Sequence, residues 1–294
     1  VSLDDISKMR SMTYPERAAY IICLFLTDFT NDELKAYTAA AYSKSRFGEI
    51  PAPVIDIGGE SILELFHGPT SAFKDFALQL LPYLLTASAK KQGINDKIAI
   101  LVATSGDTGK AALEGFADVD GTGICVFYPY GGTSEIQRLQ MTTQQGKNVL
   151  VTAVKGNFDD AQSGVKAIFT DKAYTDELKE MGIRLSSANS INWGRLVPQV
   201  AYYFSAYCDM ANAGTVKFGD EINIAVPTGN FGNILAAYIA KLCGLPVKRF
   251  ICASNKNNVL TDFIQSGTYD KNRPFYLTTS PSMDILISVS YTHL

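Results

Sequence analysis

The strongest constraint on the fold is an alternation of short apolar runs with amphipathic helical patterns along most of the chain. Continuous apolar runs of this length are typical of buried parallel strands. Strand patterns cover residues 98–103, 123–128, 148–154, 222–226 and 247–253, of which the run at 98–103 is continuously apolar. Patterns with helical periodicity lie at 110–116, 134–144, 158–170, 171–181, 192–210 and 233–242. This order predicts an α/β fold with two open, mostly parallel sheets flanked by helices.

The part of the chain before residue 97 begins with helical patterns. The expected elements are helices at 18–26 and 31–42, a strand at 61–66 and a long helix at 72–91. We expect one sheet between about 97 and 205 and a second sheet that combines earlier and later strands. The residues after 287 complete neither a helix nor a strand, so we expect a C-terminally truncated chain.

Composition excludes several classes of function. The net charge is −3, and the Lys and Arg residues form no basic block, so we expect no nucleic-acid or membrane partner. Neither a signal peptide nor a membrane-spanning run is seen, which favours a cytoplasmic protein. The five cysteines are scattered without CxxC spacing, and the two histidines are His67 and His293. Such a set predicts neither a metal site nor a Ser-His-Asp triad.

A lysine in apolar surroundings is the first candidate for chemistry. The run HGPTSAFKDFA at 67–77 places Lys74 among Phe73, Phe76 and Ala77, in the first turn of the expected helix. Desolvation and the positive end of a helix both lower the pKa of an ammonium group, as attack on a carbonyl requires. Asp75 opposes this effect and should point elsewhere. From these residues alone, an exposed lysine on an amphipathic helix is the commoner arrangement.

Three further segments lie between a strand and a helix and are suited to anions. PTGNFGN at 227–233 offers backbone N–H groups at a helix start, but an ordinary glycine turn explains it equally well. TSGDTG at 104–109 is suited to a carboxylate, or caps a helix with Asp107 or Thr108. The polar run at 186–195 ends in Arg195, which is suited to phosphate, although a surface arginine is the commoner case.

Taken together, these segments resemble the threonine synthase family. The run at 67–75 resembles that family's pyridoxal-phosphate (PLP) lysine signature, and the run at 227–233 resembles its cofactor-phosphate loop. The runs at 104–109 and 187–195 resemble its substrate loop and its substrate-phosphate segment. The likeness covers nearly the whole chain, in the same order.

The resemblance implies the fold of tryptophan synthase β and its relatives, with a helical N-terminal region. The implied domains are an N-terminal region at 1–60, a large PLP domain at 61–96 and 206–294, and a small α/β domain at 97–205. The implied reaction converts O-phospho-L-homoserine and water to L-threonine and phosphate, the last step of threonine biosynthesis. The oligomeric state stays open.

The resemblance also implies which residues hold the cofactor. Lys74 binds PLP covalently and later moves protons at the α and β carbons of the substrate. The backbone N–H groups of one segment bind the cofactor's phosphate: Gly229, Asn230, Phe231, Gly232 and Asn233. Asp107 lies near the cofactor's phenolic oxygen, where relatives often have Asn, so a carboxylate there would need a shared proton.

The substrate residues follow from the same resemblance. Ser105 and Thr108 contact the substrate carboxylate. The substrate phosphate is bound by Thr104, Asn189, Ser190 and Arg195. A threonine or serine dehydratase of the same fold would use Lys74 and the glycine loop without needing Arg195 for phosphate. The same residues also fit a non-catalytic relative that binds PLP or a phospho-amino acid, or an unrelated α/β binding protein.

Overall fold

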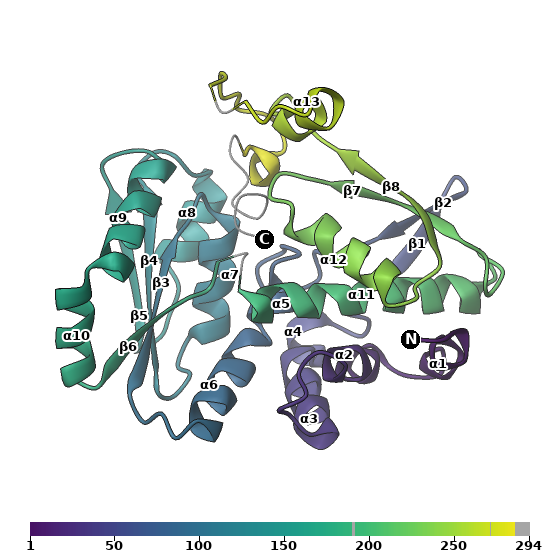
Figure 1. The fold of residues 1–294 in the computed structure, drawn as a ribbon, viewed down its shortest axis with the longest axis horizontal. Coiled ribbons are helices and arrows are strands. Elements are labelled where there is room, and N and C mark those ends of the chain that lie inside the picture. The colour runs from purple at the N-terminus through teal and green to yellow at the C-terminus, as the bar shows by residue number, and fades with distance from the viewer. Residues whose placement is uncertain (190–191, 271, 286–294) are drawn as a thin grey trace. The chain divides into compact units, whose positions relative to one another are not determined.

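The computed structural model describes residues 1–189, 192–270 and 272–285, and it contains two compact units (Figure 1). Unit 1 comprises Val1–Ala39, Ile50–Glu64 and Leu196–Leu294, and unit 2 comprises Ala40–Glu49 and Leu65–Arg195. Residues 65–96 therefore lie in the same compact unit as residues 97–195. Each unit contains segments that are distant in the sequence.

Unit 2 is built on a four-stranded parallel sheet. Its strands are β3 (Lys97–Ala103), β4 (Thr122–Pro129), β5 (Val149–Val154) and β6 (Ile183–Ser187), in the spatial order β5-β4-β3-β6. All three pairings are parallel. Alternate residues of β3 (Ile98, Ile100 and Val102) enter the core. The predicted α/β class with parallel strands is confirmed.

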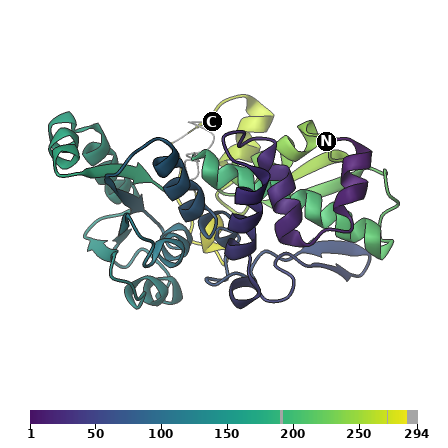
Figure 2. The ribbon, with the colours of Figure 1, turned by 90° about the horizontal axis from the view of Figure 1, so that it is seen from below.

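Helices cover both faces of this sheet. They are α7 (Asp107–Phe116), α8 (Glu135–Thr142), α9 (Phe158–Thr170) and α10 (Lys172–Glu180). Helix α7 packs on β3 and β4 through Leu113 and Phe116, which are fully buried. Helix α9 packs on the same strands from the other face, with α10 beside it (Figures 1 and 2).

The predicted helix at 72–91 is wrong, because two helices occupy this range. They are α5 (Asp75–Leu78) and α6 (Leu81–Lys91). Pro82 has no N–H to continue the ladder, and its ring would clash with the Leu78 carbonyl in an unbroken helix. Lys74 therefore lies just before a one-turn helix, with φ −64° and ψ −21°.

An aromatic cluster ties residues 40–49 to the rest of unit 2. Helix α4 (Lys44–Phe47) ends at Phe47, whose ring lies 4.9 Å from Phe76 and 5.6 Å from Tyr42, between ring centroids. The Tyr42 hydroxyl donates to the Phe76 carbonyl at 2.7 Å. These buried rings fix the start of α5, directly after Lys74.

Unit 1 contains two separate two-stranded sheets. Strands β7 (Ile222–Pro227) and β8 (Val247–Ala253) are parallel, and α12 (Gly232–Leu242) packs on them. Strands β1 (Val54–Ile57) and β2 (Glu60–Leu63) form an antiparallel hairpin. In the described part of the chain, the early strands thus pair with each other and not with the late strands as expected.

Unit 1 also contains several helices (Figure 1). They are α1 (Leu3–Met9), α2 (Tyr14–Cys23), most of α3 (Asn31–Ala41), α11 (Trp193–Ala213) from Leu196 onward, α13 (Val259–Ser266) and the 3₁₀ turn η1 (Pro281–Met283). Buried Arg17 joins α2 to α11 by donating to Asp209 at 2.6 Å and to the Ser205 hydroxyl at 2.9 Å. The expected helical N-terminal region is confirmed.

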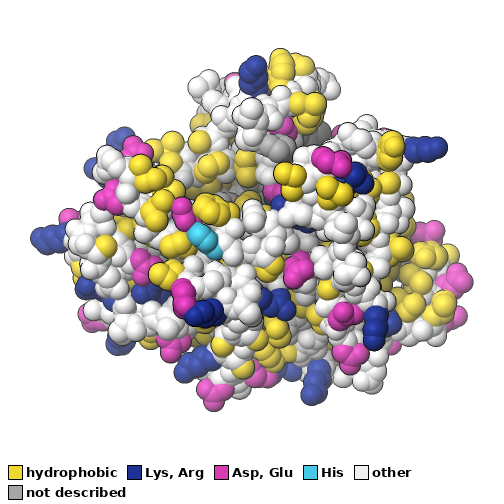
Figure 3. Space-filling view, turned by 180° about the vertical axis from the view of Figure 1, so that it is seen from behind, with side chains coloured by type: hydrophobic (Ala, Val, Ile, Leu, Met, Phe, Trp, Pro, Cys, Tyr) yellow, Lys and Arg dark blue, Asp and Glu magenta, His cyan; other side chains and the backbone are white. Residues whose placement is uncertain are grey.

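The surface shown in Figure 3 mixes cationic, anionic and apolar side chains without an extended patch of one charge. Within the described ranges, no helix has the length and apolar character needed to cross a bilayer.

Candidate active site around Lys74

The strand order of unit 2 reverses direction at β3. The chain moves outward from β3 to β4 and β5, then returns to add β6 on the other side of β3. In open α/β sheets, ligands bind outside the carboxyl ends of strands at such a reversal. The loops that follow β3 and β6 begin at Thr104 and Ala188, so two predicted segments lie at this point.

Lys74 is nearly buried at this site. Its side chain is 12 % exposed, and Nζ lies 3.5 Å from Oδ2 of Asp107 and 4.9 Å from the centre of the Phe73 ring. Burial lowers the pKa of Lys74; Asp107 opposes this shift, while Arg195 and Lys110 add to it. The expected desolvation is present, which favours a neutral and therefore nucleophilic amine.

The loop before Lys74 is closed by the buried carboxylate of Asp75. Its oxygens accept from the Thr70 backbone N–H at 2.8 Å and from the Thr70 hydroxyl at 2.7 Å. A Cβ on Gly68 would lie 2.5 Å from this carboxylate, so the turn needs glycine there. Burial raises the pKa of Asp75, although the bonds from Thr70 oppose the shift. The Asp75 carboxylate thus forms hydrogen bonds within its own loop, and it was expected to point away from Lys74.

Asp107 is the centre of a buried polar cluster. Its Oδ1 lies 3.2 Å from Nζ of Lys110 and accepts from Nε2 of Gln137 at 2.7 Å. Lys110 also donates to the Thr70 carbonyl at 2.9 Å. The cluster joins the first turn of α7 to the loop that carries Lys74.

The Thr104–Thr108 turn is organised by Thr104 itself. Its buried hydroxyl oxygen accepts from the backbone N–H groups of Gly106 at 3.0 Å and Gly109 at 2.9 Å. Gly106 has φ 143°, and a Cβ there would overlap Gln137. Thr104 therefore shapes the turn. Ser105 is exposed and Thr108 is partly buried.

The polar segment after β6 ends in a buried arginine. Arg195 is 2 % exposed, and its Nη1 donates to the carbonyl of Ala188. Burial lowers the pKa of Arg195 to about 10, so the group stays cationic at neutral pH. Asn192 turns the chain by donating to the Ser187 carbonyl and accepting from the Gly194 N–H, both at 2.9 Å. Asn189 is exposed, and Ser190 lies outside the described residues.

The predicted phosphate loop lies in unit 1, between β7 and α12. Gly229 packs so closely that a Cβ would come 2.9 Å from Met283 Cα. The first backbone N–H groups of an α-helix have no partner within the helix, so the start of α12 can bind an anion. The Asn233 side chain has a structural role, because Oδ1 accepts from the hydroxyls of Tyr202 and Tyr203.

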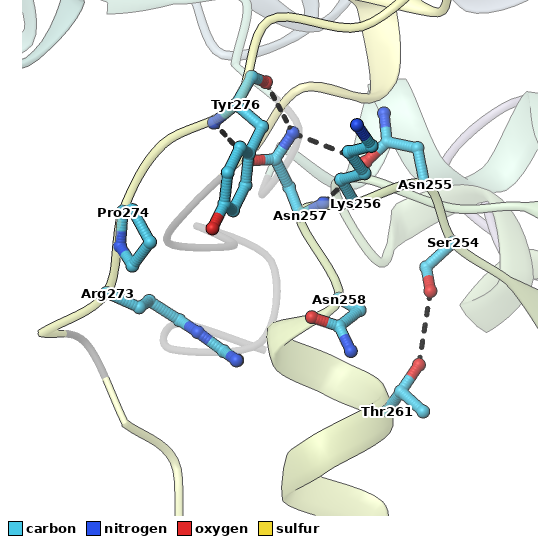
Figure 4. Close-up of a pocket in the computed structure, with 9 residues that line it drawn as sticks. All are labelled: Ser254, Asn255, Lys256, Asn257, Asn258, Thr261, Arg273, Pro274 and Tyr276. Carbon is cyan, nitrogen blue, oxygen red and sulfur yellow. Dashed lines mark hydrogen bonds between the residues drawn. The ribbon is translucent and has the colours of Figure 1, made fainter.

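A polar cavity of about 690 Å³ lies elsewhere in unit 1, after β8 (Figure 4). It is lined by Ser254, Asn255, Lys256, Asn257, Asn258, Thr261, Arg273, Pro274 and Tyr276. Beneath it, the buried carboxylate of Asp284 accepts from Asn255 at 2.7 Å and from Thr278 at 2.7 Å. No sequence motif pointed to this cavity, and none of the predicted site residues lines it. Among the described residues, no group of His, Cys, Asp and Glu is arranged to hold a metal ion.

The family model described as "Pyridoxal-phosphate dependent enzyme" matches residues 62–291. The chain belongs to this family. The expectation that PLP is the cofactor is confirmed at the level of the family. The match includes Lys74, Asp107, Arg195 and the loop at 229–233.

Relatives named as threonine synthases confirm the resemblance. Human threonine synthase-like 1 is 46 % identical over 286 residues, covering 94 % of this chain and 38 % of that protein. Threonine synthase of Pseudomonas aeruginosa is 42 % identical over 296 residues, covering 100 % of this chain and 60 % of that protein. The chain thus spans less than two thirds of each of these relatives.

Solved structures of threonine synthases share the fold. The PLP-bound enzyme of Brucella melitensis superposes with a TM-score of 0.87 at 38 % identity, covering 100 % of this chain and 60 % of that one. The yeast enzyme gives a TM-score of 0.85 at 35 % identity, covering 97 % and 56 %. The predicted fold class is confirmed.

Sequence reasoning missed three groups in this site. Lys110, Gln137 and Thr70 surround Asp107 and the lysine loop, yet none was singled out. Lys110 stands three residues after Asp107 on one helix, a spacing typical of exposed ion pairs. Only its burial, which depends on the tertiary fold, distinguishes it from such a pair.

Proposed function

We propose that the protein is a PLP-dependent carbon–oxygen lyase, a threonine synthase that converts O-phospho-L-homoserine and water to L-threonine and phosphate. The observation that carries this proposal is buried Lys74 with its lowered pKa, in the same compact unit as the buried, cationic Arg195. The likeness to threonine synthases, which covers nearly the whole chain, supports the choice of substrate.

The residues present are suited to holding PLP. Lys74 supplies the amine that binds it, and the backbone N–H groups of Gly229, Asn230, Phe231, Gly232 and Asn233 bind its phosphate. When bound, PLP withdraws electrons from the substrate's α carbon. Asp107, held by Lys110 and Gln137, lies beside Lys74 and fixes the position of its amine.

The substrate roles follow the same pattern. The guanidinium of Arg195 binds the substrate phosphate, with Asn189 and Ser190, because its planar set of N–H donors is suited to phosphate oxygens. Thr104 contributes by shaping the turn that presents Ser105 and Thr108 to the substrate carboxylate. Lys74 takes and returns the α and β protons, since a single amine reaches both neighbouring carbons.

The test is to add PLP to the purified chain and to Lys74→Ala and to record the visible absorbance. We expect the band of covalently bound PLP in the wild type alone, and phosphate release when O-phospho-L-homoserine is added. A band without phosphate release, but with ammonia release from threonine, would indicate a dehydratase. A band with neither would indicate a non-catalytic relative. No band from a folded chain would contradict the role of Lys74.

A further inference from the structure

Lys110 is a second lysine at the site, and the proposed reaction assigns it no contact with cofactor or substrate. Its side chain is 8 % exposed, and Nζ contacts Oδ1 of Asp107 at 3.2 Å and the Thr70 carbonyl at 2.9 Å. Lys74 contacts the other oxygen of the same carboxylate, Oδ2, at 3.5 Å. Asp107 therefore contacts the amines of two lysines, each through a different carboxylate oxygen.

The charges around Lys74 determine how its contact with Asp107 affects the protonation of its amine. A carboxylate paired with a single buried lysine would strongly favour the ammonium form of that lysine. Three groups on two elements act on Lys74: Asp107 and Lys110 on α7, and Arg195 on α11. Asp107 favours the protonated amine, while Lys110 and Arg195 disfavour it. Removing Lys110 would leave the attraction of Asp107 opposed only by burial and by Arg195.

We propose that Lys110 is a positioning residue that neutralises Asp107 and thereby keeps Lys74 reactive as an uncharged amine. The same ammonium group holds the Thr70 carbonyl, and Thr70 in turn binds Asp75, the residue after Lys74. Lys110 thus sets both the charge beside Lys74 and the placement of its loop. This inference rests on the proposed role of Lys74 as the cofactor lysine.

The test compares Lys110→Met, which removes the charge at similar volume, with Lys110→Arg, which keeps it. In the chain without cofactor, competitive labelling with acetic anhydride followed by peptide mass spectrometry reports the reactivity of the Lys74 amine against pH. We expect Lys110→Met to raise the midpoint of this profile by about one unit, which slows labelling about tenfold below the midpoint. Lys110→Arg should keep the wild-type midpoint, and Asp107→Asn should lower it.

A second readout uses PLP itself. The rate at which its covalent band appears should follow the same pH profiles, without any substrate. Exposed Lys172→Met on α10 is the matched control and should leave both profiles unchanged. The proposal fails if Lys110→Met slows labelling by the same factor at every pH. It also fails if the variant shows no change while circular dichroism confirms that it is folded. Failure to release phosphate from O-phospho-L-homoserine would contradict the proposed reaction and not this inference.

Discussion

Lys74 is an ionisable side chain held where solvent hardly reaches it, and such a placement should lower stability. Its pKa is lowered in the folded chain, chiefly by burial. Below the folded pKa, the native state carries the cost of a buried ammonium group in full. Between the folded pKa and 10.5, the unfolded chain binds more protons, so the free energy of unfolding rises with pH.

Lys74→Met should therefore stabilise the chain without cofactor by on the order of 1 kcal/mol at pH 7. Lys110 and Gln137 still satisfy Asp107 in this variant. The gain should shrink as pH rises toward 10, and urea unfolding followed by circular dichroism measures it. Lys172→Met, at an exposed site on α10, is the control. A gain that does not change with pH would mean that packing, not charge, causes it.

The surroundings of Lys74 and Lys110 show which features of single residues can be predicted from the sequence. Phe73 and Phe76 beside Lys74 correctly indicated desolvation, because neighbours in sequence are neighbours in space. The helix-end argument was wrong in detail, since the helix after Lys74 has only four residues. Lys110 could not be distinguished from an exposed lysine, because its burial depends on α7 packing against α5.

The position of Lys74 depends on the contact between the helices α7 and α5. A Cβ on Gly115 of α7 would overlap the carbonyl oxygen of Leu78, the last residue of α5. Gly115→Ala must push the two helices apart, and we expect it to destabilise the chain by about 1–3 kcal/mol. Because Lys74 directly precedes α5, the variant should also weaken PLP binding, measured by titration of the visible band.

Gly164→Ala on α9 is the matched control for this prediction. A Cβ there would meet no atom within 4 Å, so alanine should stabilise the helix by about 0.5–1 kcal/mol. Urea unfolding of both variants measures the difference. Equal effects at the two glycines would show that helix propensity, and not the α7–α5 contact, governs Gly115.

Element prediction succeeded where local pattern decides and failed where packing decides. The strand predicted at 98–103 is confirmed as β3, Lys97–Ala103, because a continuous apolar run fits the middle of a parallel sheet. Strand β6 was missed, since Ile183–Ser187 is half polar, as suits a strand at the edge of the sheet. The break between α5 and α6 coincides with Pro82, a residue type that local sequence alone identifies as a helix breaker.

At the scale of the whole molecule, the fold class could be predicted, whereas the pairing of the strands in each sheet could not. Alternating strands and helices give an α/β fold from local information alone. Which strands share a sheet depends on contacts between distant segments, so the hairpin of β1 and β2 was wrongly expected to join the late strands. Residues 40–49 lie in unit 2 because Tyr42 and Phe47 pack on Phe76, a contact that local pattern does not show.

That contact gives a prediction about how stability is distributed between the units. Phe47 is 1 % exposed, and Phe47→Ala should cost unit 2 about 3 kcal/mol. Amide hydrogen exchange should therefore accelerate in α5, α6 and β3, and change little in β7 and β8 of unit 1. Phe66→Ala, at a side chain that is 54 % exposed in the same unit, is the control and should change stability by less than about 0.5 kcal/mol. If β7 and β8 accelerate as much as β3, the two units unfold together, and the position of Lys74 then depends on the whole chain and not on unit 2 alone.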